Sequence, residues 1–384
     1  MGTYVLFWSA SLLSSLGIRR RLSTNLFLFV IFIFIGLRLD TGFDWPVYKL
    51  IYADFVREFS LQKLALYSLV YNQEPGFLFL LGLASKYLFS YEVFQAIITI
   101  LMLWSTVLLT RTLGVKRVAF VMAVILTYLL WSVGFSTLRQ SMAISFFNFG
   151  LVLFLRKQSR WGIACFIVAA LFQLSGIVYI AAFVASRYLW QTRKPPALGT
   201  FLLAIGAASV LAPLGLTAIS MVSSLAAEKI KFYVEGSAFV EFGISDGLFL
   251  IFFATSALLV SRSMVKPGMD VPFASEIRRL IMVLAAIGAS SSFLIVLRDR
   301  VSYELFILVS IYLMMPGLRY RWAFVGFFVC FGLANSFINI FPHPNQLAFA
   351  PYQNVIIHYA LQRESTGSSR NASFMEALSE MSKR

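Results

Sequence analysis

The sequence predicts an all-α, polytopic integral membrane protein with about 10–12 transmembrane helices. Of its residues, 59% are hydrophobic and only 13% are charged, whereas a soluble domain carries about 25% charged residues. The mean hydropathy is +0.82, and apolar runs close to the spanning length of about 18 residues recur from end to end. Because lipid cannot satisfy free backbone N–H and C=O groups, these runs are expected to be helical.

The charge distribution indicates membrane topology and argues against nucleic-acid binding. The formal net charge is +15, but Lys and Arg lie mostly between the apolar runs, as residues that orient membrane helices do. Cys165 and Cys330 lie inside apolar runs and suit small core residues, so no disulfide framework is expected. His343 and His358 are the only histidines, and we expect neither a metal site nor a cofactor.

The apolar runs set the order of the expected elements. The first run is followed by Arg19–Arg21 and is expected to be a membrane anchor, not a cleaved signal peptide. Polar loops are expected at 39–74, whose middle (Tyr48–Tyr71) suits an amphipathic helix, and at 223–245. Regular spans are expected at 3–17, 24–38, 92–110, 118–136, 139–155, 198–222, 246–263, 278–297, 302–317 and 322–340.

Two further apolar stretches, 75–89 and 162–189, are irregular. The first is short and holds Lys86, and the second is overlong and broken at Gln173–Gly176. The basic clusters between the spans can all face the cytoplasm only if each of these stretches enters and leaves by the same face. Non-helical backbone at membrane depth is tolerated only against protein or a water-filled cavity. We therefore expect two re-entrant or bent segments that line a cavity open to the outer face.

The composition also predicts how the chain is divided. Residues 1–361 are expected to form a single polytopic membrane domain. Residues 362–384 are polar and rich in serine, so we expect a C-terminal tail without fixed structure.

Polar residues gather at the span ends that should face outward. They are Arg38, Asp40, Asp44, Tyr48, Glu74, Arg139, Gln140, Gln173, Ser175, Arg298, Arg300 and Tyr303. Ionisable residues at membrane depth are functional candidates by default. Several arginines would offer planar donor forks to phosphate oxygens, and a carboxylate beside them could act as a general base. The set therefore suits a ligand with a pyrophosphate group and a reacting hydroxyl.

Several residues of this set also have a purely structural interpretation. Arg38, beside aromatic residues, suits an interfacial anchor, and Arg298 and Arg300 could reach the membrane surface from a span end. Glu74 could cap the helix that follows it, because an acid complements the dipole of a helix N-terminus. Gln173 could satisfy a neighbouring backbone carbonyl.

An ordered set of short motifs resembles the EpsG/Wzy-type polymerases of exopolysaccharide and O-antigen repeat units. The similarity runs from about residue 35 to residue 352, and the family's histidine in its "FH.S" motif is replaced by Gln173. The matching stretches are Arg38–Tyr48 ("R…G.D...Y"), Glu74–Phe77 ("EPGF"), Leu138–Ala143 ("lRQ..A"), Phe172–Gly176, Arg300–Tyr303 and Pro351–Tyr352 ("PY").

The resemblance implies an enzyme of the bacterial inner membrane that works at the outer face. Such a glycosyltransferase moves a growing chain from one undecaprenyl-pyrophosphate carrier onto the next lipid-linked repeat unit, without a metal or nucleotide sugar. The catalytic carboxylate would be Asp40, Asp44 or Glu74, in that order of preference. The remaining residues of the set would bind substrate. A chain-length regulator protein is a further candidate partner besides membrane lipid.

Two other functions compete with polymerisation. A transporter or flippase of lipid-linked oligosaccharide would usually carry more charges along a central path and internal repeats. A membrane O-acyltransferase would need a paired histidine or His-Asp motif, which this sequence lacks.

Overall fold

The computed structural model describes residues 2–18, 21–87, 90–130, 134, 136–188, 244–262, 273–291, 295–315, 321–339, 345–349, 352–356, 361 and 365–381. Within these ranges the chain forms 15 α-helices, two short 3₁₀ helices and no β-strand. The first helices are α1 (Gly2–Gly17), α2 (Arg21–Gly36), α3 (Trp45–Arg57), η1 (Leu61–Lys63), α4 (Leu64–Tyr71), α5 (Pro75–Tyr87), α6 (Tyr91–Thr112) and α7 (Val118–Leu129). The others are α8 (Leu138–Leu155), α9 (Ser159–Phe172), α10 (Ser175–Tyr188), α13 (Ile244–Arg262), α14 (Ala274–Ser290), α15 (Ile295–Leu313), α16 (Arg321–Asn339), η3 (Asn345–Ala348) and α18 (Gly367–Met381).

The prediction of an all-α polytopic membrane protein is confirmed. Helices α6 and α8 are long and apolar enough to cross a membrane, and several shorter helices are apolar as well. The expected spans 92–110 and 139–155 correspond closely to these two helices. The expected span at 198–222 and nearly all of the expected loop at 223–245 lie outside the described residues.

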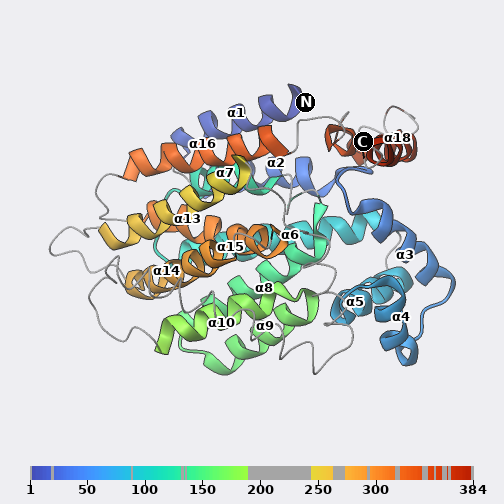
Figure 1. Cartoon of the computed structure of the whole chain (residues 1–384), viewed down its shortest axis with the longest axis horizontal. Helices are drawn as coiled ribbons and strands as arrows, with labels where there is room; N and C mark the ends of the chain where they lie inside the picture. Colours follow the sequence, from blue (N-terminus) through green and yellow to red (C-terminus); the bar gives the residue numbers. More distant parts are fainter. Residues whose placement is uncertain are drawn as a thin grey trace.

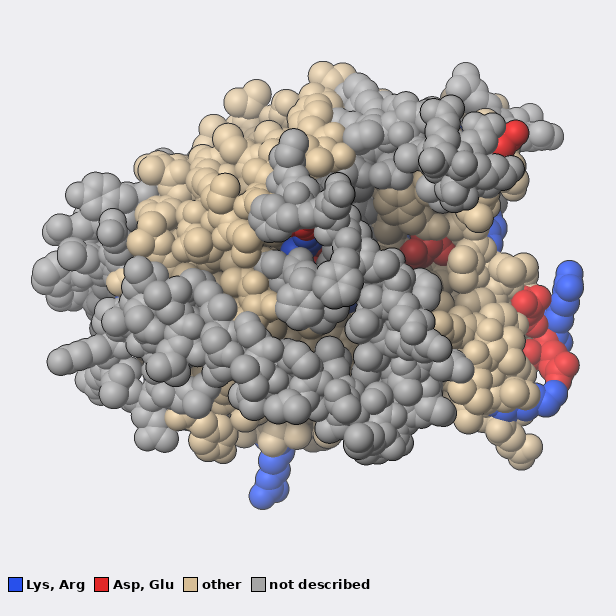
Figure 2. Space-filling view, in the orientation of Figure 1, with Lys and Arg blue, Asp and Glu red and all other residues tan. Residues whose placement is uncertain are grey.

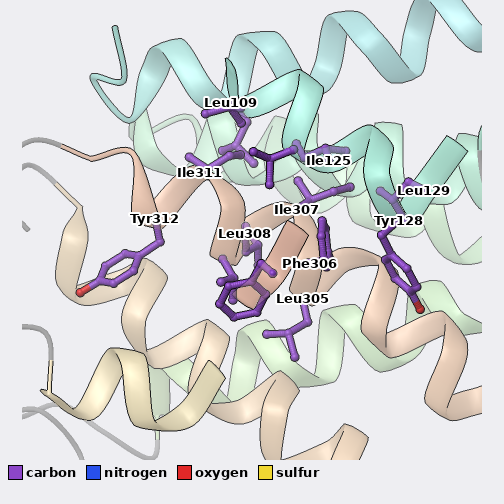
Figure 3. Close-up of a cluster of buried hydrophobic side chains, with 14 of the residues drawn as sticks. Leu109, Ile125, Tyr128, Leu129, Leu305, Phe306, Ile307, Leu308, Ile311 and Tyr312 are labelled. Atoms are coloured by element: carbon purple, nitrogen blue, oxygen red, sulfur yellow. The ribbon is translucent and has the colours of Figure 1, made fainter. Parts of the chain in front are cut away.

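Helix α15 lies in the middle of the bundle (Figure 1). Its side chains Leu305, Phe306 and Ile307 are almost completely buried, and they pack with α6 and α7 in one large apolar cluster (Figure 3). Residues from both neighbouring helices, such as Leu109 and Ile125, point into the same cluster. The second half of α15, from Leu305 to Leu313, is apolar on nearly all sides, and such a segment is stable in an interior position.

Helices α9 and α10 form the bent element predicted for 162–189. Each has 14 residues, which gives a length of about 21 Å, less than the hydrocarbon thickness of about 30 Å. They meet at Gln173 and Leu174, where the Gly176 amide donates to the Gln173 carbonyl over 2.8 Å. A C-cap with extended backbone at Gln173 ends α9 and allows the chain to reverse.

The loop between α2 and α5 differs from the single amphipathic helix expected around Tyr48–Tyr71. It folds into α3 and α4, separated by η1, and gathers with α5 at one end of the bundle (right in Figure 1). Extended backbone at Glu58 and Ser60 ends α3 and lets α4 turn back. Figure 2 shows acidic and basic side chains gathered at this edge of the molecule.

The expectation of an unstructured C-terminal tail is wrong for residues 367–381, which form α18. This helix lies against the loop after α2. Ser365 donates to the Asp40 carboxylate over 2.6 Å, and Arg370 donates to the Asp40 carbonyl over 2.7 Å. Gly367 allows the close approach, because a Cβ at this position would lie 2.3 Å from the Asp40 Cβ. A polar sequence is therefore ordered here by specific contacts with the membrane domain.

The segment after α16 returns to the end of α2. The Tyr352 hydroxyl donates to the Phe34 carbonyl over 2.7 Å, and the Asn354 amide donates to the Ile33 carbonyl over 2.9 Å. An antiparallel bridge joins Arg38 to Asn354. The first and last motifs of the sequence are thus neighbours in space.

Helices α5 and α9 approach closely at Gly76, and we expect substitution there to be costly. A Cβ at Gly76 would lie 2.6 Å from the Leu171 carbonyl oxygen, which is backbone and cannot move aside. Gly76→Ala should therefore lower the free energy of unfolding by about 1–3 kcal/mol. Thermal unfolding of the purified protein in detergent would measure the change. The matched control is Gly326→Ala in α16, where nothing lies within 4 Å of the new methyl group. Equal stability of the two variants would contradict the contact.

Candidate active site

Four side chains form a continuous hydrogen-bonded chain at the end of the bundle where α3 and α5 lie. Asp44 directly precedes α3, and Tyr48 is in the first turn of that helix. The Tyr48 hydroxyl donates to Asp44 Oδ2 over 2.9 Å and accepts from Arg139 Nε over 3.0 Å. Arg139, in the first turn of α8, also forms an ion pair with Glu74, which directly precedes α5. The starts of α3 and α5 are thereby linked by side-chain contacts to the start of α8.

The surroundings of Asp44 shift the pKa of its carboxyl group. Burial raises the pKa of the Asp44 carboxyl above its ordinary value, although Arg139, the hydrogen bond from Tyr48 and Arg300 oppose the shift. Burial likewise raises the pKa of the Tyr48 phenol, so that it remains a donor to Asp44 at neutral pH. A carboxylate that holds protons more strongly is a stronger base.

A second group surrounds Arg300. Arg300 Nη1 donates to Gln140 Oε1 over 3.1 Å, and Ser175 donates to the same oxygen over 2.9 Å. Gln140 Nε2 donates to the Tyr179 hydroxyl over 2.6 Å, which in turn donates to the Arg300 carbonyl over 2.6 Å. Because Gln140 follows Arg139 in α8, and because Arg300 interacts electrostatically with Asp44, the two groups are adjoining parts of one site.

Arg298 belongs to a separate cluster. It is buried, pairs with Asp246 of α13 and with Asp299 at 3.0 Å, and stacks over the Phe249 ring at 4.2 Å. The run Arg298–Arg300, expected at the end of a span over 278–297, instead lies within α15. The reason is that α14 already ends at Ser290, with Ser291 at its C-cap.

Asp40 and Arg38 have partners outside the Asp44 group. Asp40, with a left-handed φ of 44°, forms an ion pair with Lys49 at 2.9 Å, and Lys49 also pairs with Glu92 at 3.3 Å. Arg38 is almost fully buried and donates to the Ile35 carbonyl over 2.9 Å, as a residue that closes the end of α2 does. Both residues therefore have partners that hold the loop to the bundle.

Gln173 and Tyr303 are the remaining members of the predicted set. Gln173 is buried at the α9–α10 turn, and its Oε1 accepts no hydrogen bond from any described residue. The Tyr303 ring packs at 5.7 Å from the Tyr128 ring, and Tyr303 also interacts electrostatically with Tyr179 of the Arg300 group. Hydrogen bonds and an ion pair thus connect Asp44, Tyr48, Glu74 and Arg139, and connect Gln140, Ser175 and Arg300, whereas Asp40 and Arg298 form ion pairs with other residues.

Two notable residues escaped the sequence-based set. Tyr179 links Gln140 to Arg300, but in the sequence it is one aromatic residue among many in apolar runs. Glu304 is completely buried in α15, and neither carboxylate oxygen accepts a hydrogen bond from a described residue. The sequence signal that could have identified Glu304 is its position one helical turn after Arg300. Among the described residues, no group of three or more His, Cys, Asp or Glu side chains could hold a metal ion.

The fold and this site together define an integral membrane protein with arginine and carboxylate side chains gathered at one end of a helical bundle. Residues 21–354 match the EpsG family model, and the chain belongs to the EpsG family. The resemblance expected from the motifs is thereby confirmed. Membership suggests a role of the polysaccharide repeat-unit polymerase type, with a lipid-linked saccharide substrate in a membrane. Comparisons with curated proteins and with solved structures gave no match.

Proposed function

We propose that this protein is a glycosyltransferase that polymerises undecaprenyl-pyrophosphate-linked oligosaccharide repeat units. The observation that carries the proposal is the partly buried chain from Asp44 through Tyr48 and Arg139 to Glu74, with Arg300 beside it. It combines a carboxylate base with two arginine cations. Glycosyl transfer from a pyrophosphate-linked donor needs a base for the acceptor hydroxyl and cations for the departing pyrophosphate.

In the proposed reaction, a hydroxyl of the acceptor sugar attacks the anomeric carbon of the donor chain. The hydroxyl proton passes to the Asp44 carboxylate, a glycosidic bond forms, and the bond from the anomeric carbon to the pyrophosphate oxygen breaks. Arg300 and Arg139 stabilise the charge that develops on the departing undecaprenyl pyrophosphate. Since this lipid is itself the leaving group, the proposed reaction uses no nucleotide sugar, metal or cofactor.

Asp44 replaces Asp40 as our preferred base. Asp40 is engaged by Lys49 and Ser365, whereas Asp44 has Tyr48 as its hydrogen-bond donor and lies close to both arginines. Glu74 is less suited, because its ion pair with Arg139 favours the form that has no proton and weakens it as a base.

The proposed site faces the outer side of the bacterial inner membrane. Arg156 and Lys157 follow the far end of α8, Arg160 lies in the first turn of α9 beside it, and basic residues between spans favour the cytoplasm. The start of α8, with Arg139, therefore faces outward. A chain-length regulator protein is a proposed partner at this face.

Chain extension by the purified protein tests the function directly. The protein would be reconstituted in liposomes with a lipid-linked repeat unit and no nucleotide sugar, and the products analysed by mass spectrometry. We expect lipid-linked chains of two or more repeat units. Transfer of unextended lipid-linked units across the bilayer, without longer products, would instead identify a flippase.

A further inference from the structure

A cavity of about 290 Å³ lies at the opposite end of the bundle from the candidate active site. It is formed by the C-terminal ends of α8 and α10 and by the start of α14. Lys157 lies 18 residues beyond Arg139, which corresponds to about 27 Å along a helix. The cavity is therefore distinct from the site formed by Asp44 and Arg139.

The walls of this cavity are of two kinds. Its interior is lined by apolar side chains, among them Phe154, Phe183 and Leu280. Its polar lining contains three basic residues, Lys157, Arg187 and Arg279, against one acidic residue, Glu276. Lys157 and Arg187 are exposed at the rim.

The single acid does not cancel the positive charge of the rim. Glu276 accepts from Ser275 over 2.9 Å and lies 3.9 Å from Arg279, so it offsets at most one of the three positive charges. The first turn of α14 also lies at the cavity, and a helix N-terminus attracts anions. The cavity thus combines a positively charged rim with an apolar interior.

We propose that this cavity binds an anionic phospholipid of the cytoplasmic leaflet. The lipid phosphate would contact Lys157, Arg187 and Arg279, and the first methylene groups of an acyl chain would lie along Phe154 and Phe183. A basic pocket between transmembrane helices on the cytoplasmic side is a recognised site for acidic headgroups. The volume suits a headgroup with the beginning of a chain, while the rest of the chain extends into the bilayer.

Lipid bound here would join helices that carry the candidate active site at their other ends. Helix α8 carries Arg139 and Gln140, and α10 begins with Ser175. A ligand that binds only the folded protein stabilises it in proportion to the logarithm of ligand concentration. Anionic lipid should therefore raise the melting temperature, whether or not the proposed polymerase activity is correct.

The test compares lipids on full-length protein purified in detergent. Phosphatidylglycerol or phosphatidylcholine would be titrated, and the melting temperature and the lipids retained in native mass spectra recorded. We expect phosphatidylglycerol to raise the melting temperature and phosphatidylcholine to leave it unchanged. The double variant Lys157→Gln/Arg187→Gln should need at least tenfold more phosphatidylglycerol for the same rise.

The matched control is Lys116→Gln/Arg160→Gln, which removes two exposed basic residues from the same end of the bundle but outside the cavity. It should respond as the unmodified protein does. Equal loss of response in the two double variants would show diffuse charge attraction and overturn the site. A full rise with inorganic phosphate alone would overturn the assignment to a lipid. Melting temperatures measured in detergent alone show whether each variant folds normally.

Discussion

Replacing Asp44 by Asn should slow chain extension by about 10²–10⁴-fold, the usual contribution of a general base. The amide keeps the size of the carboxylate and can still accept a hydrogen bond from Tyr48, but it cannot take a proton from the acceptor hydroxyl. Initial rates of extension on a lipid-linked repeat unit, at matched amounts of folded protein, would measure the loss.

Asp40→Asn is the comparison that separates a base from a positioning carboxylate. Asp40 is bound by Lys49 and Ser365, so its loss should loosen the contact with α18 and lower the rate less than tenfold. If Asp40→Asn were the more damaging change, the base would be Asp40 and our preference would be wrong. Tenfold or smaller effects in both variants would leave no role for either carboxylate in proton transfer.

The pH dependence of the reaction gives a second measure of the same carboxylate. A general base works when ionised, so activity should fall as the pH drops through the pKa of Asp44. Because burial raises that pKa, the acid limb should lie at higher pH than for an ordinary aspartate. The residual activity of Asp44→Asn should lack this limb. An acid limb retained in the variant would assign it to another group.

The sequence predicted those parts of the fold that depend on local pattern. Apolar runs located the long helices, because burial in lipid and in the bundle core both require them. The polar interruption at Gln173 located the α9–α10 turn. The order of α18 could not be predicted, since it depends on contacts that Ser365 and Arg370 make with Asp40, more than 320 positions away.

For the candidate site too, the sequence predicted which residues take part but not which distant residues meet. Sequence reasoning selected the arginines and carboxylates because such residues are rare in membrane segments. It could not pair them: Arg139 meets Glu74 across 65 positions, and Arg298 meets Asp246 across 52. Asp40 was preferred because it is near Arg38 in sequence, but the arginines that interact with Asp44 come from α8 and α15. Only the packing of helices decides which charges meet.

The second large effect is expected at Arg300, and it should appear in activity without loss of stability. The Arg300 side chain donates to the neutral amide of Gln140, and Asp44, with which Arg300 interacts electrostatically, still has Arg139 nearby, so removal of Arg300 leaves no buried charge without a counterion. Loss of a charged hydrogen bond to pyrophosphate costs about 1.5–3 kcal/mol. Arg300→Gln should therefore lower the extension rate by about 10–150-fold. Arg300→Lys should also be impaired, because lysine keeps the charge but lacks the planar fork.

Arg139→Gln is the comparison variant for Arg300→Gln, because the partner of Arg139 is a charged side chain. Its partner Glu74 is buried, and breaking a buried ion pair from one side destabilises a protein by about 3–5 kcal/mol. Arg139→Gln should therefore lower both the melting temperature and the activity, whereas Arg300→Gln should lower activity alone. Adding Glu74→Gln to Arg139→Gln should restore stability, because no buried charge then remains unpaired, but not the activity that Arg139 supplies. If Arg300→Lys extended chains at the unmodified rate, Arg300 would not be a bidentate ligand of the pyrophosphate, and the leaving-group role would fall to Arg139 alone.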